Sequence, residues 1–356
     1  MLPDDITADW LGGVLGADIA SLEQARIGDG LVGLNLRIAI TYGDPSVVGT
    51  SSSTGAALPA SVVIKLPSLD ETSRATGVAL RNYEREVKFY DTIADTVDIR
   101  VPHCHFGTWE ESTGDFTLVL EDMAPADQGD QVRGCPVGQA ETAVLELAKL
   151  HAPRWNDPLL DEHEFLQRRN GDDDTEQLVG LWAMFLPGFL ATFEPHLSAQ
   201  ASALVTEFGD HLATWMGGRS GPVTVTHGDY RLDNLLFATP AGGPPVTAVD
   251  WQTPGHGPPV ADLAYFCGAG LLPEERRLHE QDLLSGYADA LGEYGVQVER
   301  DWLWEQYRRE AFGGVVMSVI ASQVVGSTAR SEAMFAAMAT RHLQACLDLD
   351  SLETVS

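Results

Sequence analysis

Three polar residues that lie close together in the chain have the chemistry that phosphoryl transfer needs. They are Asp229, Asn234 and Asp250, within the stretches Thr226–Phe237 and Val249–Gln252. Carboxylate and amide oxygens are hard ligands of the kind that Mg²⁺ prefers, and a carboxylate can also accept the proton of a hydroxyl group. The residue types therefore predict Mg²⁺-assisted transfer of a phosphoryl group.

Short strands are expected to position these residues. One strand ends just before His227, Leu235–Phe237 forms a second and Thr247–Val249 a third. The polar groups would then lie where strands end in tight loops, as binding residues often do.

The stretch His227–Asn234 reads H-G-D-x-x-x-x-N, and Asp250–Gln252 reads D-W-Q. Protein kinases have H-R-D-x-x-x-x-N followed by D-F-G. Over roughly residues 20 to 345 the chain resembles the aminoglycoside phosphotransferase and choline kinase-like family, whose loop is H-G-D-x-x-x-x-N. The resemblance implies that Asp229 is the catalytic base and that Asn234 and Asp250 bind Mg²⁺. A His-Gly-Asp tripeptide alone is a common turn, so the prediction depends on the whole loop and on the motifs upstream.

A glycine-rich stretch near the N-terminus carries Gly28, Gly30 and Gly33 in a G-x-G-x-x-G pattern. The residues Leu34–Ile40 alternate between apolar and polar, which predicts a strand and therefore a β-hairpin. A dinucleotide-binding glycine loop would open a helix instead, so a Rossmann dehydrogenase is disfavoured. The resemblance implies a flap whose glycines let backbone amides approach the phosphates of ATP; a plain hairpin turn is the alternative.

Lys65 lies inside the β-branched run Ser61–Pro67, where a charge is costly unless it meets an anion. The run resembles the kinase V-A-I-K strand, whose lysine holds the α- and β-phosphates and pairs with a helix glutamate. A lysine that protects an edge strand is the alternative. The partner helix is expected at Ala79–Ile93, where both Glu84 and Glu86 are candidates; the family pattern favours Glu86, and the choice stays open.

The strand Phe116–Leu120 is followed by Glu121 and Met123. In kinases such a strand leads into the hinge, so the resemblance implies that the Glu121 carbonyl and the Met123 amide bind adenine. We therefore expect an α+β, protein-kinase-like fold of two lobes. A small β-rich N-lobe spans residues 1–123, and a mainly helical C-lobe spans residues 124–356.

Apolar periodicity predicts the C-lobe helices. They are expected at Gln139–Leu150, Leu178–Phe193, Ala201–Met216, Leu278–Tyr294, Asp301–Val325 and Ser331–Leu349. We interpret His151 as a core residue. The resemblance implies that Asp262 braces the catalytic loop, although a helix N-terminal charge is an alternative.

Two residues of the catalytic stretch, Gly228 and Arg231, bear on the transferred phosphoryl group and on the class of substrate. Arg231 could stabilise the transferred phosphoryl group, or could form only a surface ion pair with Asp233. Gly228 replaces the kinase arginine that reads an activation-loop phosphate, and only ten residues separate Gln252 from Asp262. There is little room for an activation loop, which favours a small-molecule substrate.

Composition limits the kinds of binding partner and the compartment that are expected. The 356-residue chain has a formal net charge of −30, which disfavours nucleic acid and anionic membranes. Its four cysteines form no C-x-x-C pair, so free thiols in a reducing cytoplasm are expected. The start of the chain does not resemble a secretory signal, and the apolar run Gly313–Gly326 is too short to span a membrane.

The sequence thus predicts an ATP- and Mg²⁺-dependent O-phosphotransferase, monomeric or homodimeric, acting on a small hydroxyl-bearing acceptor of the aminoglycoside, choline or other alcohol type. The acidic chain slightly favours a cationic acceptor, although its acidity is better explained as serving solubility alone. The aromatic residues of the C-terminal helices, Trp302, Trp304, Tyr307 and Phe312, could equally line an apolar pocket. A nucleotide-binding pseudokinase is the alternative function.

Overall fold

The computed structural model describes residues 1–28, 32–49, 58–167 and 172–356. The chain divides into two compact units. We call residues 1–95 and 101–124 the N-lobe, and residues 96–100 and 125–356 the C-lobe. The predicted lobes, 1–123 and 124–356, differ from these by the short segment 96–100 and by residue 124.

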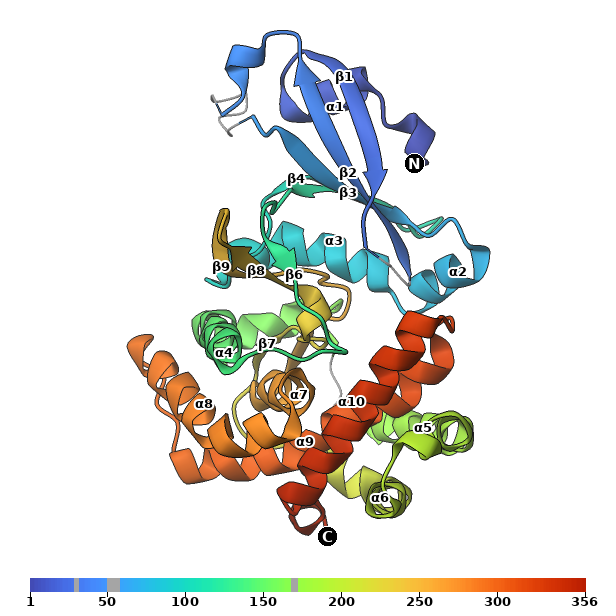
Figure 1. Cartoon of the computed structure of the whole chain (residues 1–356), viewed down its shortest axis with the longest axis vertical. Coiled ribbons are helices and arrows are strands. Elements are labelled where there is room, and N and C mark those ends of the chain that lie inside the picture. The colour runs from blue at the N-terminus through green and yellow to red at the C-terminus, as the bar shows by residue number, and fades with distance from the viewer. Residues whose placement is uncertain (29–31, 50–57, 168–171) are drawn as a thin grey trace. The chain divides into compact units, whose positions relative to one another are not determined.

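The N-lobe contains a five-stranded antiparallel sheet with the strand order β1-β2-β3-β5-β4 (Figure 1). The strands are β1 (Ile19–Arg26), β2 (Gly33–Tyr42), β3 (Ser61–Pro67), β4 (Cys104–Glu110) and β5 (Asp115–Glu121). Alternation in β2 buries Leu34, Leu36, Ile38 and Ile40 on one face, as expected for a strand with one face against a core. β1 and β2 flank the glycine stretch, so the predicted hairpin is confirmed.

Helices complete the N-lobe: α1 (Ala8–Leu15), α2 (Glu71–Ala79) and α3 (Asn82–Thr92). α3 was expected to begin at Ala79. Instead α2 ends there, and Arg81 takes a left-handed conformation (φ 57°) that separates the two helices. The core of the sheet includes Leu11 and Leu15 from α1, both buried.

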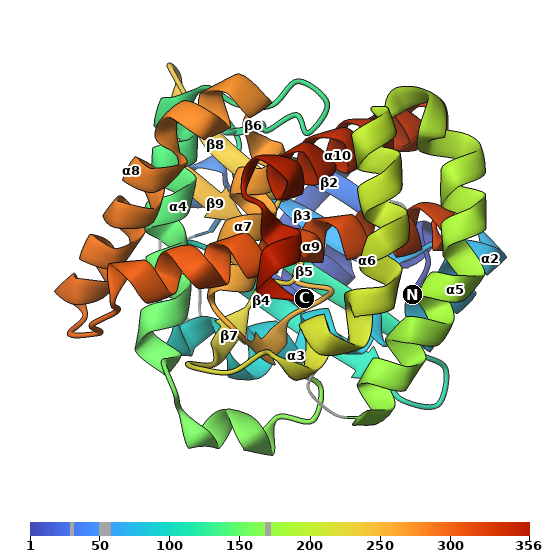
Figure 2. The same cartoon turned by 90° about the horizontal axis from the view of Figure 1, so that it is seen from below.

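The C-lobe is mainly helical (Figures 1 and 2). Its α-helices are α4 (Val137–His151), α5 (Asp172–Phe193), α6 (Ala199–Gly217), α7 (Val260–Gly270), α8 (Pro273–Glu293), α9 (Arg300–Val324) and α10 (Ala329–Asp348). The predicted helices match these within a few residues, except that α5 starts six residues before Leu178. In the view of Figure 2, α5 and α6 run side by side. The α+β, kinase-like fold class is confirmed.

Short strands support the loops of the C-lobe. β6 (Asp127–Gln128), β8 (Leu235–Thr239) and β9 (Gly242–Ala248) form one antiparallel sheet, and β7 (Thr224–Thr226) pairs with β10 (Gly255–Gly257). The stretch predicted as a strand at Thr247–Val249 is the end of β9. These two small sheets carry both halves of the catalytic stretch.

One helical stretch, Asp173–His196, is long and apolar enough to cross a membrane by length and composition. Of its most apolar window, 17% is buried within the chain, and Met184 is largely exposed. A helix of this length and composition also occurs in the core of proteins that do not span a membrane, so a single one is weak evidence for a membrane span. The apolar run singled out in the sequence lies instead in α9, where Val315, Val316 and Val319 are buried.

Candidate active site

The strands of the C-lobe bring the catalytic stretch together. The Asn234 amide group donates to the backbone carbonyl of Asp229 and to its Oδ2, both at 2.9 Å. β8 and β9 are in register, and the backbone N–H of Val249 donates to the Asn234 carbonyl at 2.9 Å. Asp250 therefore directly follows Val249, the residue whose backbone is bonded to Asn234. Its φ of 66° is rare outside glycine and turns the chain as β9 ends.

Three side chains hold the carboxylate of Asp229. The Tyr265 hydroxyl donates to Oδ1 at 2.8 Å, the Arg231 Nε lies 3.2 and 3.1 Å from the two oxygens, and Asn234 completes the set. Burial, and after it the Asp229 carboxylate, raise the pKa of Tyr265 well above its ordinary value, so this hydroxyl remains a donor. The carboxylate is held in one orientation, as a general base should be.

Arg231 also bonds to Asp233, with Nη1 at 2.6 Å from Oδ2. Burial acts to lower the pKa of this guanidinium, but the charge of Asp229 outweighs it and raises the pKa above its ordinary value. The ion pair of Arg231 with Asp233, one of the two alternatives from the sequence, is present, together with a pair to Asp229. A contact between Arg231 and a phosphoryl group stays a prediction.

Asp262 anchors the loop that carries Asp229. Its Oδ2 accepts the His227 backbone N–H at 2.7 Å and its Oδ1 accepts the Gly228 backbone N–H at 2.9 Å. Burial raises the pKa of Asp262, but the hydrogen bond and charge of His151 outweigh it, so the pKa lies below its ordinary value. The predicted bracing role of Asp262 is confirmed.

His151 lies in the core as interpreted from the sequence, and it also has a polar role. Its Nε2 is 3.3 Å from Asp262 Oδ2, and its Nδ1 is 2.7 Å from the hydroxyl of the buried Tyr287. The bracing carboxylate is therefore itself supported by α4 and α8. Nothing in the sequence around His151 indicates this contact, because its partners are more than 100 residues away.

In the N-lobe, Lys65 of β3 is buried and pairs with Glu86 of α3, with 2.5 Å between Nζ and Oε1. Glu84 is also buried, but it contacts Arg81 and Lys88 of the same helix region, both at 2.7 Å, whose side chains are partly exposed. The structure thus selects Glu86 as the partner of Lys65. A buried amine held by a carboxylate is the arrangement that kinases use to hold ATP phosphates, and that role stays a prediction.

The other predicted nucleotide contacts occupy the N-lobe sheet. Gly28 has a positive φ of 67°, and Gly33 begins β2 opposite Pro67. Gly30 lies outside the described residues. Glu121 ends β5, with its backbone N–H donating to the His103 carbonyl at 2.8 Å, and Met123 follows it in a buried position. Adenine and phosphate binding by these residues stay predictions.

The residues present fit a magnesium–nucleotide complex. Mg²⁺ bound to a nucleotide takes one or two carboxylates and fills its shell with phosphate oxygens and water. Asn234 and Asp250 lie at neighbouring strand ends and offer one amide oxygen and one carboxylate. Among the described residues, no group of three or more His, Cys, Asp or Glu side chains could hold a metal by itself, which this kind of site does not require.

The match to known families decides the classification. Residues 28–298 match the ecdysteroid kinase-like family, which is more than half of the chain. The chain belongs to the ecdysteroid kinase-like family. The resemblance to small-molecule kinases that was inferred from the catalytic stretch is thereby confirmed.

Solved structures agree with the kinase-like fold of this family member. A candidate aminoglycoside phosphotransferase from Ralstonia eutropha is 14% identical, with a TM-score of 0.54, and the match covers 96% of this chain and 97% of that one. An ethanolamine kinase from Plasmodium vivax is 13% identical, with a TM-score of 0.53 and coverage of 92% and 84%. A microcompartment-associated aminopropanol kinase is 13% identical, with a TM-score of 0.50 and coverage of 98% and 98%. The structural neighbours of this kinase-like enzyme family are thus small-molecule kinases, and at these identities they show its fold.

Among curated proteins, the family member matches mouse acyl-CoA dehydrogenase family member 10 with 39% identity over 69 residues. The match covers 18% of this chain and 6% of the mouse protein. Since so little of the mouse protein is covered, its activity says nothing directly about this chain.

Two residues that support Asp229, Tyr265 and His342, were not predicted from the sequence. Tyr265 contacts Asp229 across 36 positions, and its ring stacks on buried His342 with 5.3 Å between centroids. A Cβ at Gly268 or Gly314 would lie within 2.6 or 2.1 Å of the His342 ring, so these glycines make room for it. Burial lowers the pKa of His342 to about 3, so a neutral ring supports Tyr265.

Proposed function

We propose that the protein transfers the γ-phosphoryl group of Mg²⁺-bound ATP to a hydroxyl group of a small molecule. The observation that carries the proposal is the carboxylate of Asp229, which three donors orient on a loop anchored by Asp262. The family membership supports the reaction class, and the ethanolamine and aminopropanol kinases among the structural neighbours support an alcohol as acceptor.

The chain's own residues would share the reaction as follows. Asp229 accepts the proton of the acceptor hydroxyl group. The oxygen of that hydroxyl group then bonds to the γ-phosphorus of ATP. The bond between the γ-phosphorus and the oxygen that bridges it to the β-phosphorus breaks, which releases ADP. Lys65, held by Glu86, binds the α- and β-phosphates. Asn234 and Asp250 would bind Mg²⁺, which neutralises charge on the phosphates.

ADP release in the presence of Mg²⁺-ATP and a panel of alcohols tests this proposal. Asp229→Ala should lower kcat by about 10²–10⁴, because a positioned base contributes that much. ATP binding, measured by calorimetry, should persist in that variant and fall in Asp250→Ala. Near-full turnover by Asp229→Ala would refute the assignment. A pseudokinase, which would bind ATP without turnover, is disfavoured because each of the predicted catalytic and metal-binding residues is present.

A further inference from the structure

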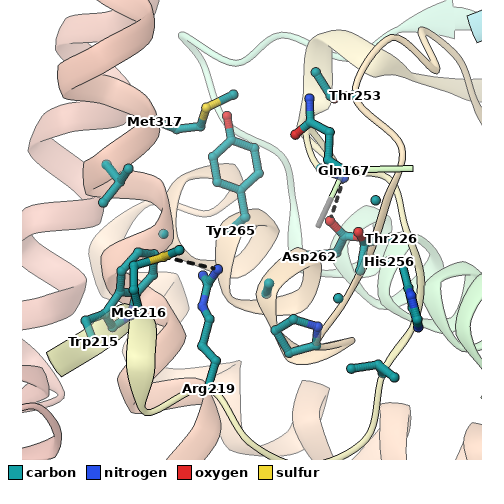
Figure 3. A pocket seen from close by; sticks show the side chains of 18 of the residues that line it. Gln167, Trp215, Met216, Arg219, Thr226, Thr253, His256, Asp262, Tyr265 and Met317 are labelled. Atoms are coloured by element: carbon teal, nitrogen blue, oxygen red, sulfur yellow. Dashed lines mark hydrogen bonds between the residues drawn. The ribbon is translucent and has the colours of Figure 1, made fainter. Parts of the chain in front are cut away.

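A pocket of about 140 Å³ lies in the C-lobe, lined by side chains such as Trp215 and Tyr265 (Figure 3). Its described lining residues include none of the three polar residues of the catalytic stretch, Asp229, Asn234 and Asp250. They also include none of the aromatic residues that the sequence offered for an apolar pocket, Trp302, Trp304, Tyr307 and Phe312. This pocket therefore does not locate the nucleotide, and the contacts that bear on its base lie in the N-lobe.

One carboxylate ties the segment after β5 to two other strands of the N-lobe sheet. It belongs to Asp122, and 3% of its side chain is exposed. The Nη2 of Arg37, in β2, donates to Oδ1 at 2.9 Å, and the Nε of the same guanidinium lies 2.8 Å from Oδ2. The hydroxyl of Ser61, the first residue of β3, donates to Oδ2 at 2.7 Å. Charge-assisted bonds of this kind are stronger than neutral ones, so Asp122 is held firmly on β2 and β3.

These contacts lie at the point where strand pairing stops. The ladder between β3 and β5 ends with the pair Val62 and Glu121. Beyond it, Asp122 Oδ1 accepts the backbone N–H of Ala124 at 3.1 Å, which closes a turn around Met123. The conformation of residues 122–124 therefore depends on the Asp122 side chain rather than on strand pairing.

The surroundings of Asp122 keep it ionised. Burial raises its pKa, but the hydrogen bonds from Ser61 and Arg37 outweigh burial, so the pKa lies below its ordinary value. A buried carboxylate needs such partners wherever it lies, so stability of the sheet is the alternative explanation for this cluster. The place of Asp122 in the chain favours a role in binding, because its two neighbours are Glu121 and Met123, the predicted adenine contacts.

On these grounds we propose that Asp122 is a positioning residue for the nucleotide base. It holds the backbone on either side of it, at Glu121 and Met123, in the conformation that meets adenine. The inference rests on the proposed function, because it requires that ATP binds to the chain at this segment.

A residue that acts only through this backbone should affect only one part of the nucleotide. Adenosine and ATP share the base, whereas inorganic tripolyphosphate shares with ATP only the phosphates, which Lys65 is predicted to hold. Loss of the Asp122 contacts should therefore weaken adenosine and ATP by the same factor and leave tripolyphosphate unaffected. A general loosening of the N-lobe sheet would weaken the binding of all three.

Two variants remove the contacts from opposite sides. Asp122→Asn keeps the shape of the side chain and removes its charge. Arg37→Met removes the main cation and leaves Asp122 in place, and the 42% exposure of the Arg37 side chain makes this change unlikely to prevent folding. Asp115→Asn is the matched control, because Asp115 lies at the opposite end of β5 and pairs with Arg74, both of them partly exposed.

Calorimetry with the full chain tests the proposal, using ATP, adenosine and tripolyphosphate, each with Mg²⁺. Asp122→Asn should raise the Kd of ATP and of adenosine about tenfold, and Arg37→Met should raise both about threefold or more. The Kd of tripolyphosphate should not change in either variant, and no Kd should change in Asp115→Asn. Thermal unfolding confirms that each variant is folded.

The results that would contradict the proposal are distinct from those that would contradict the function. An unchanged Kd of adenosine in both variants would overturn the positioning role, and equal weakening of all three ligands would assign Asp122 to the stability of the sheet. In either case ATP binding by the wild type would leave the proposed phosphotransferase function standing. Failure of the wild type to bind ATP would overturn both.

Discussion

The two polar clusters of this chain are held in place by different means. Lys65 and Glu86 belong to a strand and a helix, so regular elements set the geometry of the pair. Asp229 belongs to a loop, and its orientation comes from side chains such as Tyr265, while Asp262 fixes the loop itself. The first cluster depends on its immediate surroundings. The second depends on a series of contacts that extends to α4 and α8.

This difference predicts which step of the reaction a substitution in each cluster should affect. A change in the Lys65–Glu86 pair should affect nucleotide affinity and leave the chemical step intact. A change at Asp262 or His151 should instead alter the position of Asp229, although neither side chain contacts the Asp229 carboxylate.

The largest effect is expected from Asp262→Ala. The change leaves the buried amide of His227 and the partly buried amide of Gly228 without an acceptor, at about 1–3 kcal/mol for a buried group. Because the loop then loses its position, kcat should fall by about 10²–10⁴ while the Kd for ATP changes little. Steady-state kinetics, calorimetry and thermal unfolding measure the three quantities. Asp262→Asn keeps one acceptor oxygen and should retain more activity, and wild-type kcat in Asp262→Ala would show that the base needs no anchor.

Glu86→Gln should have the next largest effect. It keeps the shape of the side chain and removes the charge that holds buried Lys65. We expect the KM for ATP to rise about tenfold, equivalent to about 1.4 kcal/mol, with a smaller change in kcat. Glu84→Gln is the control two residues away: Glu84 is also a buried carboxylate, but it pairs with the partly exposed Arg81 and Lys88 and not with Lys65. Equal effects of the two substitutions would contradict the importance of the buried pair.

Tyr265→Phe should lower kcat by about three- to tenfold, because one hydrogen bond to the Asp229 carboxylate is lost while two other donors remain. Tyr265 acts here as a positioning residue, so the KM for ATP should not change and the melting temperature should change little. A rise in the KM for the acceptor with unchanged kcat would instead assign Tyr265 to binding alone.

The smallest effect concerns acid stability. The hydrogen bond from Arg81 lowers the pKa of Glu84 to about 2, below the usual value near 4.3. Ionised Glu84 therefore stabilises the folded state above pH ~4.3, and this contribution is lost as the pH falls toward about 2. Urea unfolding at pH 5, 4 and 3 should show a slightly shallower loss of stability in Glu84→Gln than in the wild type. Parallel curves would mean that the pair contributes nothing measurable.

The sequence predicted the elements with strong local signals. β3 has the predicted bounds Ser61–Pro67, since its β-branched residues and its final proline define it well. β1 (Ile19–Arg26) was not singled out, because most of its side chains are exposed and show no alternation. α2 was also missed, although Asp70 caps its N-terminus by accepting the Ser73 backbone N–H at 2.8 Å.

The candidate site divides in the same way. The spacing of Asp229 and Asn234 lies within one short motif, so the sequence reveals it. Tyr265 and His151 reach the site from α7 and α4, and no local pattern records which distant side chains meet in the folded chain. The family resemblance indicated that Asp262 braces the loop, but the contact between His151 and Asp262 is seen only in the structure.

Gly228 stands where protein kinases keep an arginine, and it takes a φ of 78°. A Cβ there would lie 2.3 Å from the Thr253 carbonyl oxygen, so any larger side chain would require the two loop segments to separate. A single mutation therefore could not install a sensor for a phosphorylated loop in this chain.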